Sequence, residues 1–209
     1  MNNRDYKNFT SNTLFHIYNR GNNKEKIFAD EQDYGAFLLR LGLVLGFKID
    51  ELQNYKQLHF PNSRIRITEF SKEAFKIHSF CLMPNHFHLI IEQCGQENIS
   101  NLILKLCTSY AKYFNKKYSR VGHLFQDQFK AVLIESNEQL MWLSSYIHMN
   151  PVKDKLVNRP EEYEWSSYLD FSSKRSMPIV QTDLLLSIFE PKNFEKETLA
   201  YVSKGTFDI

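Results

Sequence analysis

Long apolar runs and paired cysteines are missing from this sequence of 209 residues. No stretch of eighteen apolar residues occurs, which argues against a membrane-spanning helix. The first residues, from Met1 to Lys7, lack the apolar stretch of a signal peptide. Cys81, Cys94 and Cys107 are odd in number and form no CxxC pair, so they suggest neither a disulfide framework nor a zinc knuckle. We therefore expect reduced thiols in a bacterial-type cytoplasm.

Net charge is also low, at +2, and by itself says little about partners. The distribution of charge says more, because the segment from Lys105 to Lys130 contains a single acidic residue, Asp127. Basic and aromatic residues are interleaved along this segment. The basic ones are Lys105, Lys112, Lys116, Lys117, Arg120 and Lys130, and the aromatic ones are Tyr110, Tyr113, Phe114, Tyr118, Phe125 and Phe129. Binders of single-stranded nucleic acid have this composition. A solvated helix face above an aromatic core has it too, so composition leaves both interpretations open.

The apolar content of 43% supports a substantial core, and no internal repeat or low-complexity linker divides the chain. Apolar, β-prone runs predict strands, and helical spacing of apolar residues predicts helices. The strands are expected at Thr13–Arg20, Phe75–Leu82, His86–Gln93 and Phe129–Ile134, and the helices at Asp30–Leu45, Ile99–Tyr118 and Ser136–Asn150. The stretch Gly46–Lys72 is uncertain, with a short strand expected at Arg64–Ile67.

This order of elements predicts an α+β fold with a ferredoxin-like or RRM-like antiparallel sheet and helices packed on one face. A final helix and a tail follow. The open face of such a sheet is a common platform for nucleic acid.

Two of the expected helices have clear internal patterns. In Ile99–Tyr118 one stripe is apolar and the opposite stripe is polar: Leu102, Leu106, Tyr110, Tyr113 and Phe114 against Lys105, Ser109, Lys112 and Lys116. The last helix begins with a capping box, in which Ser136 and Gln139 satisfy free N–H groups reciprocally. We expect it to end at Met149 or Asn150, before Pro151.

His86-Phe87-His88 is the most specific local pattern. On a strand, residues i and i+2 point to the same face, so both imidazoles project together while Phe87 points into the core. Two adjacent imidazoles form half of a metal site. Two half-exposed surface histidines are the alternative. Zinc hydrolases of barrel fold also contain HxH, but they are longer chains with further ligands at the ends of the barrel strands.

The last helix supplies a second pattern. Tyr146 and Asn150 are spaced i, i+4 and lie on one helix face, whereas Leu140, Leu143 and Ile147 form the stripe facing the core. A phenol and an amide on the exposed face of a capped helix can reach a metal held by the sheet. A partly buried tyrosine and an asparagine that only ends the helix are the alternative interpretation.

Four stretches together resemble the HUH single-tyrosine transposases, particularly the REP-associated tyrosine transposases. In the order of the family they are Phe15–Asn22 (FHIYNRGN), Leu82–Ile91 (LMPNHFHLII), Gly122–Gln126 (GHLFQ) with Phe129–Ala131, and Ser145–Val152 (SYIHMNPV). The resemblance covers residues 15–169, and four ordered motifs are far more specific than any one of them. Gly46–Lys72 looks longer than the usual connection, and the chain from Asn158 onward matches only loosely.

The resemblance implies roles for four residues. His86 and His88 would be metal ligands, Tyr146 the nucleophile and Asn150 the third ligand in a position where relatives use Gln. The cofactor would be Mg²⁺ or Mn²⁺, and the activity would be nicking and strand transfer of single-stranded DNA through a 5′-phosphotyrosine. The substrate would form hairpins, and the protein would act at the nucleoid, with a homodimer as one arrangement. Residues 1–170 would form the catalytic domain and residues 171–209 a C-terminal extension.

Further candidates for DNA contacts are less specific, because turns and packed loops use the same residue types. They are Asn19, Arg20, Lys105, Lys112, Lys116, Arg120, His123 and Gln126. We expect His78 to be structural, and Trp165 and Tyr168 to pack back onto the domain.

Two rival functions remain open at this point. One is a domesticated protein that binds hairpin DNA or RNA without cutting it. The other is a metal phosphoesterase, although no additional Asp, Glu or His cluster accompanies the HxH to activate water. The sequence leaves open the target DNA, the oligomeric state, whether Tyr146 serves the metal of its own chain, and whether the protein mobilises its own gene.

Overall fold

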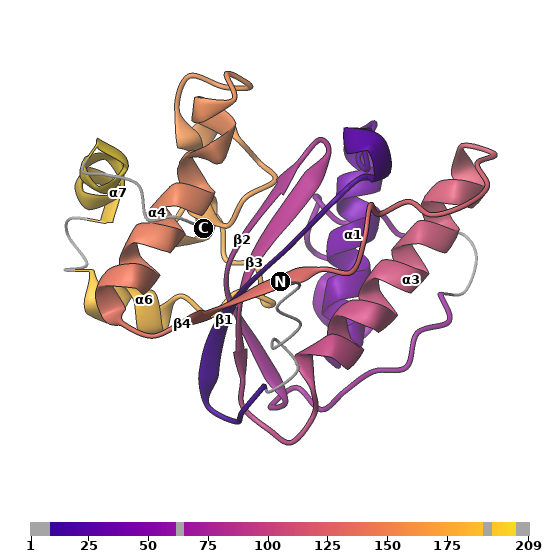
Figure 1. Cartoon of the computed structure of the whole chain (residues 1–209), viewed down its shortest axis with the longest axis horizontal. Helices are drawn as coiled ribbons and strands as arrows, with labels where there is room; N and C mark the ends of the chain where they lie inside the picture. Colours follow the sequence, from indigo (N-terminus) through magenta and orange to yellow (C-terminus); the bar gives the residue numbers. More distant parts are fainter. Residues whose placement is uncertain (1–8, 62–64, 190–193, 204–209) are drawn as a thin grey trace, which may run out of the picture.

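The computed structural model describes residues 9–61, 65–189 and 194–203, and a four-stranded antiparallel sheet lies at its centre (Figure 1). The strands are arranged in the order β2-β3-β1-β4. Their bounds are β1 Thr13–Arg20, β2 Phe75–Met83, β3 His86–Gln93 and β4 Lys130–Ile134. This is the strand order of the ferredoxin-like plan, so the predicted fold is confirmed.

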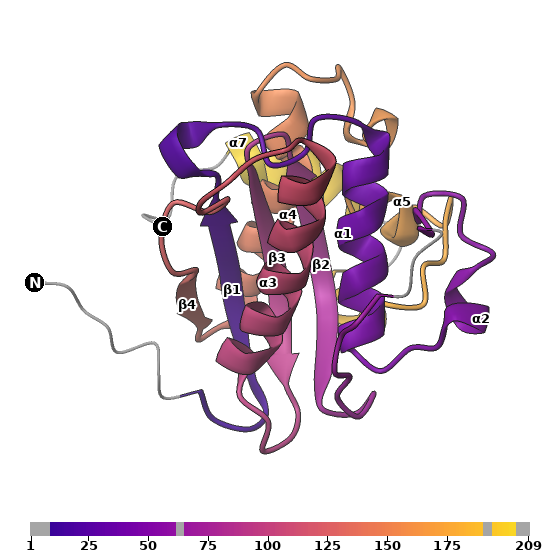
Figure 2. The same ribbon diagram turned by 90° about the vertical axis from the view of Figure 1, so that its right-hand side faces the viewer.

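One face of the sheet is covered by α1 (Glu31–Val44) and α3 (Ile99–Lys117) (Figure 2). Between them and the sheet lies the core, where the Phe37 ring of α1 is 5.1 Å from the Phe87 ring of β3. Tyr110 of α3 is fully buried, as its place on the apolar stripe predicts. Tyr113, expected on the same stripe, is only half-buried, since it lies at the margin where Arg40 of α1 crosses its ring.

The opposite face carries α4 (Asn137–Lys153), so the sheet separates α4 from α1 and α3 (Figure 1). Ser144 of α4 is hydrogen-bonded to Ser79 of β2 across this second interface, with an Oγ–Oγ distance of 3.1 Å. The arrangement agrees with the expectation of a sheet with helices on one face and an additional C-terminal helix.

Both ends of α4 differ in detail from the sequence prediction. At its start Ser136 accepts from the Gln139 N–H as expected, but the Gln139 side chain accepts from the N–H of Glu135 instead of Ser136. At its end the helix continues through Pro151 to Lys153, so the predicted stop before the proline was wrong. Pro151 has no N–H to donate to the preceding turn, but its own carbonyl accepts from Leu156.

Among the described residues of the 46–72 region there is one short helix, α2 (Ile49–Leu52), which the sequence did not predict. The expected strand at Arg64–Ile67 was wrong for residues 65–67, which form no strand, and Arg64 lies outside the described residues. Residues 65–68 lie beside α3 instead and line a groove there.

The chain beyond α4 packs on the edge of β2 and on α4 itself. Its short elements are η3 (Pro160–Glu162), α5 (Tyr168–Phe171), α6 (Asp183–Ile188) and α7 (Phe194–Ser203), and η2 (Asn22–Lys24) follows β1 near the start of the chain. Bridges join Cys81 to Ser166 and Ile77 to Val180, so this segment covers the free edge of β2.

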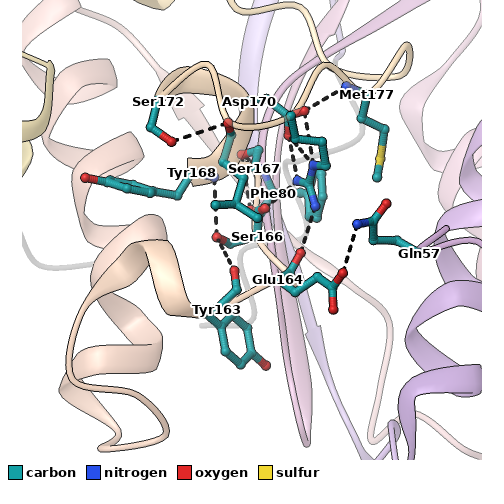
Figure 3. A network of polar contacts seen from close by, with 12 residues as sticks. Gln57, Phe80, Tyr163, Glu164, Ser166, Ser167, Tyr168, Asp170, Ser172 and Met177 are labelled. Atoms are coloured by element: carbon teal, nitrogen blue, oxygen red, sulfur yellow. Dashed lines mark hydrogen bonds and ion pairs between the residues drawn. The ribbon is translucent and has the colours of Figure 1, made fainter. Parts of the chain in front are cut away.

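A buried polar network fixes the same segment (Figure 3). Arg175 pairs with Asp170 at 2.6 Å and also donates to the Ser166 carbonyl. Nearby, the Trp165 ring stacks on Tyr34 of α1 with centroids 4.8 Å apart, and Tyr168 is buried. The expectation that these two rings pack back onto the domain is confirmed. Within the described residues, no helix combines the length and the apolar character that crossing a membrane requires.

Candidate active site

His86 and His88 lie on β3, one of the two central strands, and their rings share one face of the sheet. The ring centroids are 5.0 Å apart and the rings are nearly perpendicular. Phe87 between them is fully buried on the α1 side. Antiparallel pairing with β1 places Tyr18 opposite His88 and Arg20 opposite His86, so these four side chains start from one patch of sheet.

Tyr146 reaches this patch from α4 of the same chain. Its ring centroid is 6.1 Å from that of His88, with the rings perpendicular. Trp142, one turn earlier, stacks on the Tyr146 ring at 5.2 Å. One turn later on the same helix lies Asn150, whose buried Nδ2 has no hydrogen-bond partner in the described residues.

These side chains line a pocket of about 580 Å³, which we call the histidine–tyrosine pocket. It is lined by Tyr18, Asn19, Arg20, Lys24, His86, His88, Gln126, Asp127, Gln128, Lys130 and Tyr146. Asn150 is not among the lining residues and lies behind Tyr146, only 5% exposed. The pocket therefore brings together His86, His88 and Tyr146. The fourth residue that the motifs indicate, Asn150, lies next to the pocket.

A second layer of side chains holds the two imidazoles. The Nδ1–H of His86 donates to the side-chain oxygen of Asn85 at 2.6 Å. The Nδ1 of His88 is 2.9 Å from the Nε2 of His16, a buried residue of β1 whose ring stacks on His88 at 5.1 Å. Each imidazole thus uses Nδ1 within the protein, and no hydrogen bond from the described residues occupies its Nε2.

Burial keeps these histidines neutral. Desolvation lowers the pKa of His86 to about 4, with a smaller contribution from Arg20 and an opposing one from Asp154. The pKa of His88 is lowered by desolvation and by the neighbouring His16 and His86. Uncharged imidazoles carry the lone pair that metal ligation requires.

The two phenols of the pocket are shifted in the opposite direction. Desolvation and then Asp154 raise the pKa of Tyr146, and the side chain of Asn150 lowers it in part. Desolvation and then Tyr146 raise the pKa of Tyr18. Both phenols therefore carry their protons near neutral pH.

The residues of this site lie within a segment that is similar to a known protein family. Residues 63–150 match the family described as transposase IS200 like, a range that includes His86, His88, Tyr146 and Asn150. Over these residues the chain is similar to the IS200-like transposases.

The fold has a solved counterpart in the structure of a REP-associated tyrosine transposase bound to a REP hairpin. It is 15% identical, the match covers 83% of this chain and 87% of that one, and the TM-score is 0.55. A crystal structure of a candidate transposase from Deinococcus radiodurans is 13% identical, with 67% of this chain and 92% of that chain covered and a TM-score of 0.38. No curated protein matches the chain.

The other residues expected to contact DNA lie in three places. Asn19, Arg20 and Gln126 line the histidine–tyrosine pocket, although Asn19 is buried and donates to the Asp127 carbonyl at 3.2 Å. His123 is exposed on the loop before β4, and Arg120 forms an ion pair with Glu25 at 3.0 Å. The lysines Lys105, Lys112 and Lys116 lie on α3, on the other side of the sheet from His86 and His88.

Sequence reasoning missed several residues of this candidate site. The residues not named as candidates for the site are His16, Tyr18, Lys24, Asp127, Gln128 and Lys130, although each lines the pocket or contacts a histidine that does. A signal was present for two of them, because His16 and Tyr18 have the same i, i+2 spacing as His86 and His88. No group of three His, Cys, Asp or Glu side chains within the described residues could hold a metal ion.

Proposed function

We propose that this IS200-like protein is a metal-dependent nuclease and strand transferase of single-stranded DNA, with Tyr146 as the nucleophile. His86, His88 and Asn150 would hold a divalent cation, Mg²⁺ or Mn²⁺. The observation that supports this most directly is the pocket into which one sheet face directs both histidines and α4 directs Tyr146. Because all of them belong to one chain, we propose that a single chain forms the active site.

The residues present fit a divalent cation. Both imidazoles are neutral, both Nδ1 atoms are engaged by Asn85 and His16, and both Nε2 atoms are left for a ligand. Metal-binding histidines use their second nitrogen in this way, which fixes the ring orientation. Asn150 supplies an amide oxygen as the third donor. Imidazole and amide donors suit Mn²⁺ well and Mg²⁺ acceptably.

When bound, the cation would polarise the P–O bonds of the scissile phosphate and neutralise developing charge. The chain itself provides nucleophile and orientation. Stacking on Trp142 holds the Tyr146 ring at the pocket wall. The phenol oxygen attacks phosphorus, forms the 5′-phosphotyrosine and loses its proton to water. The bond to the leaving 3′ oxygen breaks, and this oxygen takes up a proton from water to give a 3′-hydroxyl.

This intermediate explains joining as well as cutting. The phosphotyrosine retains the phosphodiester energy, so a 3′-hydroxyl from another strand can reverse the step. The pocket suits a single strand, because Tyr18 offers a ring for stacking and Arg20, Lys24 and Lys130 offer cations for phosphates. Since the relative of similar fold was solved with a REP hairpin, we propose hairpin-forming DNA as the substrate. We also propose residues 1–170 as the catalytic domain, with residues 171–209 as its extension.

A cutting and joining assay tests the proposal. A labelled hairpin with a single-stranded tail is incubated with the protein, Mn²⁺ and an unlabelled acceptor strand. The wild type should give a cut product and a joined product, and a chelator or His86→Ala should remove both. Tyr146→Phe should remove both while leaving the affinity for the hairpin nearly unchanged, because only the attacking oxygen is lost.

Tyr18→Phe is the matched control, since Tyr18 lies in the same pocket and should retain cutting. Tight hairpin binding by the wild type with no cutting under any metal would favour the rival, a hairpin-binding protein without nuclease activity. Cutting that yields only free phosphate ends and no joined strand would favour a phosphoesterase.

A further inference from the structure

A second basic surface lies on α3, across the sheet from the histidine–tyrosine pocket. It is a groove of about 880 Å³ between α3 and residues 65–68, which we call the α3 groove. In Figure 1 the segment that leads into β2 runs along the outer side of α3. The groove is lined by Arg40, Pro61, Ile65, Arg66, Ile67, Thr68, Leu104, Lys105, Thr108, Ser109, Lys112, Tyr113, Lys116 and Lys117, with no acidic residue among them.

Three of these cations are available to a ligand. Arg66, Lys112 and Lys116 are exposed, and none of them forms an ion pair with a carboxylate of the described residues. Two others are engaged within the fold: the Lys105 ammonium lies 3.6 Å from the centre of the Phe70 ring, and Lys117 pairs with Asp33 at 2.8 Å. The groove thus offers three unpaired cations with no acidic residue among its lining.

The walls between these cations are apolar. Leu104 is 65% exposed, an unusual position for a large aliphatic side chain on a helix. Ile65, Ile67 and the half-buried ring of Tyr113 continue the surface. A free phosphate ion, or a negatively charged metal complex, would contact only the cations of the groove. A nucleic-acid strand uses both features, because its phosphates contact cations and its bases lie on apolar and aromatic surface.

The α3 groove is connected to the candidate active site along the surface. A hollow of about 560 Å³ lies between α3 and the loop of residues 122–128. It shares Thr108 and Lys112 with the α3 groove, and it shares Gln126, Asp127 and Gln128 with the histidine–tyrosine pocket. The three cavities therefore form one path from the catalytic histidines, over the loop before β4, to the far side of α3.

We propose that the α3 groove binds the part of the same single-stranded DNA that flanks the scissile phosphate, after the strand has passed over the 122–128 loop. This inference rests on the proposed function, and it assigns a role to residues 65–68, which lie within the long connection between α1 and β2. An acidic peptide would match the charge of the groove, but it would not explain the continuity of the path with the pocket.

Binding of oligonucleotides of two lengths tests the proposal, at several salt concentrations and without cleavage. We compare a strand of roughly 8 nucleotides, which one such binding site of a few to sixteen nucleotides can cover, with a strand of roughly 30 nucleotides, which extends beyond it. The variant is Arg66→Ala/Lys112→Ala/Lys116→Ala. The control removes the same charge elsewhere, as Lys56→Ala/Lys155→Ala/Lys174→Ala.

The wild type should bind the long strand more tightly than the short one. In the groove variant this advantage should disappear, and the slope of log affinity against log salt for the long strand should fall by about 2, at roughly 0.7 for each of three phosphate contacts. The short strand should bind as before, and the control variant should resemble the wild type. Because all three side chains are exposed, the thermal unfolding midpoint should not change.

An unchanged length advantage in the groove variant would overturn the inference, as would equal losses for short and long strands. Covalent attachment of the short strand keeps the two proposals apart. It should persist in the groove variant, so a defect of the groove leaves the chemistry intact. A wild type that attaches neither strand would contradict the proposed function itself.

Discussion

At the scale of single residues, His16 connects the core to the proposed metal site. It is 1% exposed, and its Nε2 lies 2.9 Å from the Nδ1 of His88. For the Nε2 of His88 to offer a lone pair, its Nδ1 must carry the proton and donate to His16. The Nδ1 of His16 then carries a proton and has no partner in the described residues. A buried N–H group without a hydrogen-bond partner lowers the stability of the fold. Such groups are typical of functional sites.

We predict that His16→Phe lowers the affinity for Mn²⁺ by about 10- to 100-fold, the usual cost of losing a second-layer partner of a metal ligand. His16→Gln, which keeps a polar group near His88, should lose less. Isothermal titration of the metal-free protein with Mn²⁺ measures the effect. His78→Gln is the control, because His78 is also buried but pairs with Glu92 on the edge side of the sheet. Equal metal affinity in His16→Phe and the wild type would refute the role of His16.

The shared face of His86 and His88 could be predicted from sequence, because the strand period of two fixes it locally. The partnership of His16 with His88 could not. These residues are 72 positions apart, and they meet only through the register in which Tyr18 pairs with His88. A local pattern contains no information about that register, although the repeated i, i+2 spacing of polar rings on β1 was a hint.

At the scale of elements, the positions of strands and helices could be predicted from apolar spacing and caps. The predicted bounds were wrong where tertiary packing determines the end of an element. The bounds of β1 and β3 were predicted without error. The end of α4 was not, since Pro151 is buried and the helix continues beyond it to Lys153. Packing against the rest of the molecule outweighs the loss of one backbone hydrogen bond there.

The C-terminal elements depend on the buried ion pair of Arg175 and Asp170, whose side chains are 7% and 2% exposed. We predict that Arg175→Met lowers the free energy of unfolding by about 3 to 5 kcal/mol, because the Asp170 carboxylate loses its partner while buried. Urea denaturation measures this loss. Arg159→Met is the control: its ion pair with Glu162 is exposed and should contribute less than about 1 kcal/mol. Similar losses of unfolding free energy in both variants would show that the network around Asp170 does not stabilise the C-terminal elements more than an exposed ion pair does.

At the scale of the whole molecule, the sheet separates two surfaces. Their basic and aromatic residues cannot be told apart in the sequence. Lys112 and Lys116 lie on the α3 side, whereas Arg20, Lys130 and Tyr146 lie at the histidine–tyrosine pocket. Composition left contact with nucleic acid open, and it could not assign residues to either side, because that depends on which face each helix covers. The loop of residues 122–128 connects the two surfaces, and its His123 and Gln126 had drawn attention only through a motif.

The central claim is that Tyr146 attacks the phosphate, and the most direct measurement is to identify the residue that carries DNA. The whole protein is incubated with a hairpin bearing a single-stranded tail and Mn²⁺, denatured and digested, and the nucleotide-bearing peptide is sequenced by mass spectrometry. Our account predicts a phosphodiester on Tyr146, at the 5′ end of the cut strand, and none in the presence of a chelator. Attachment to Tyr18, the other phenol of the pocket, or cleavage with no attached nucleotide, would contradict it.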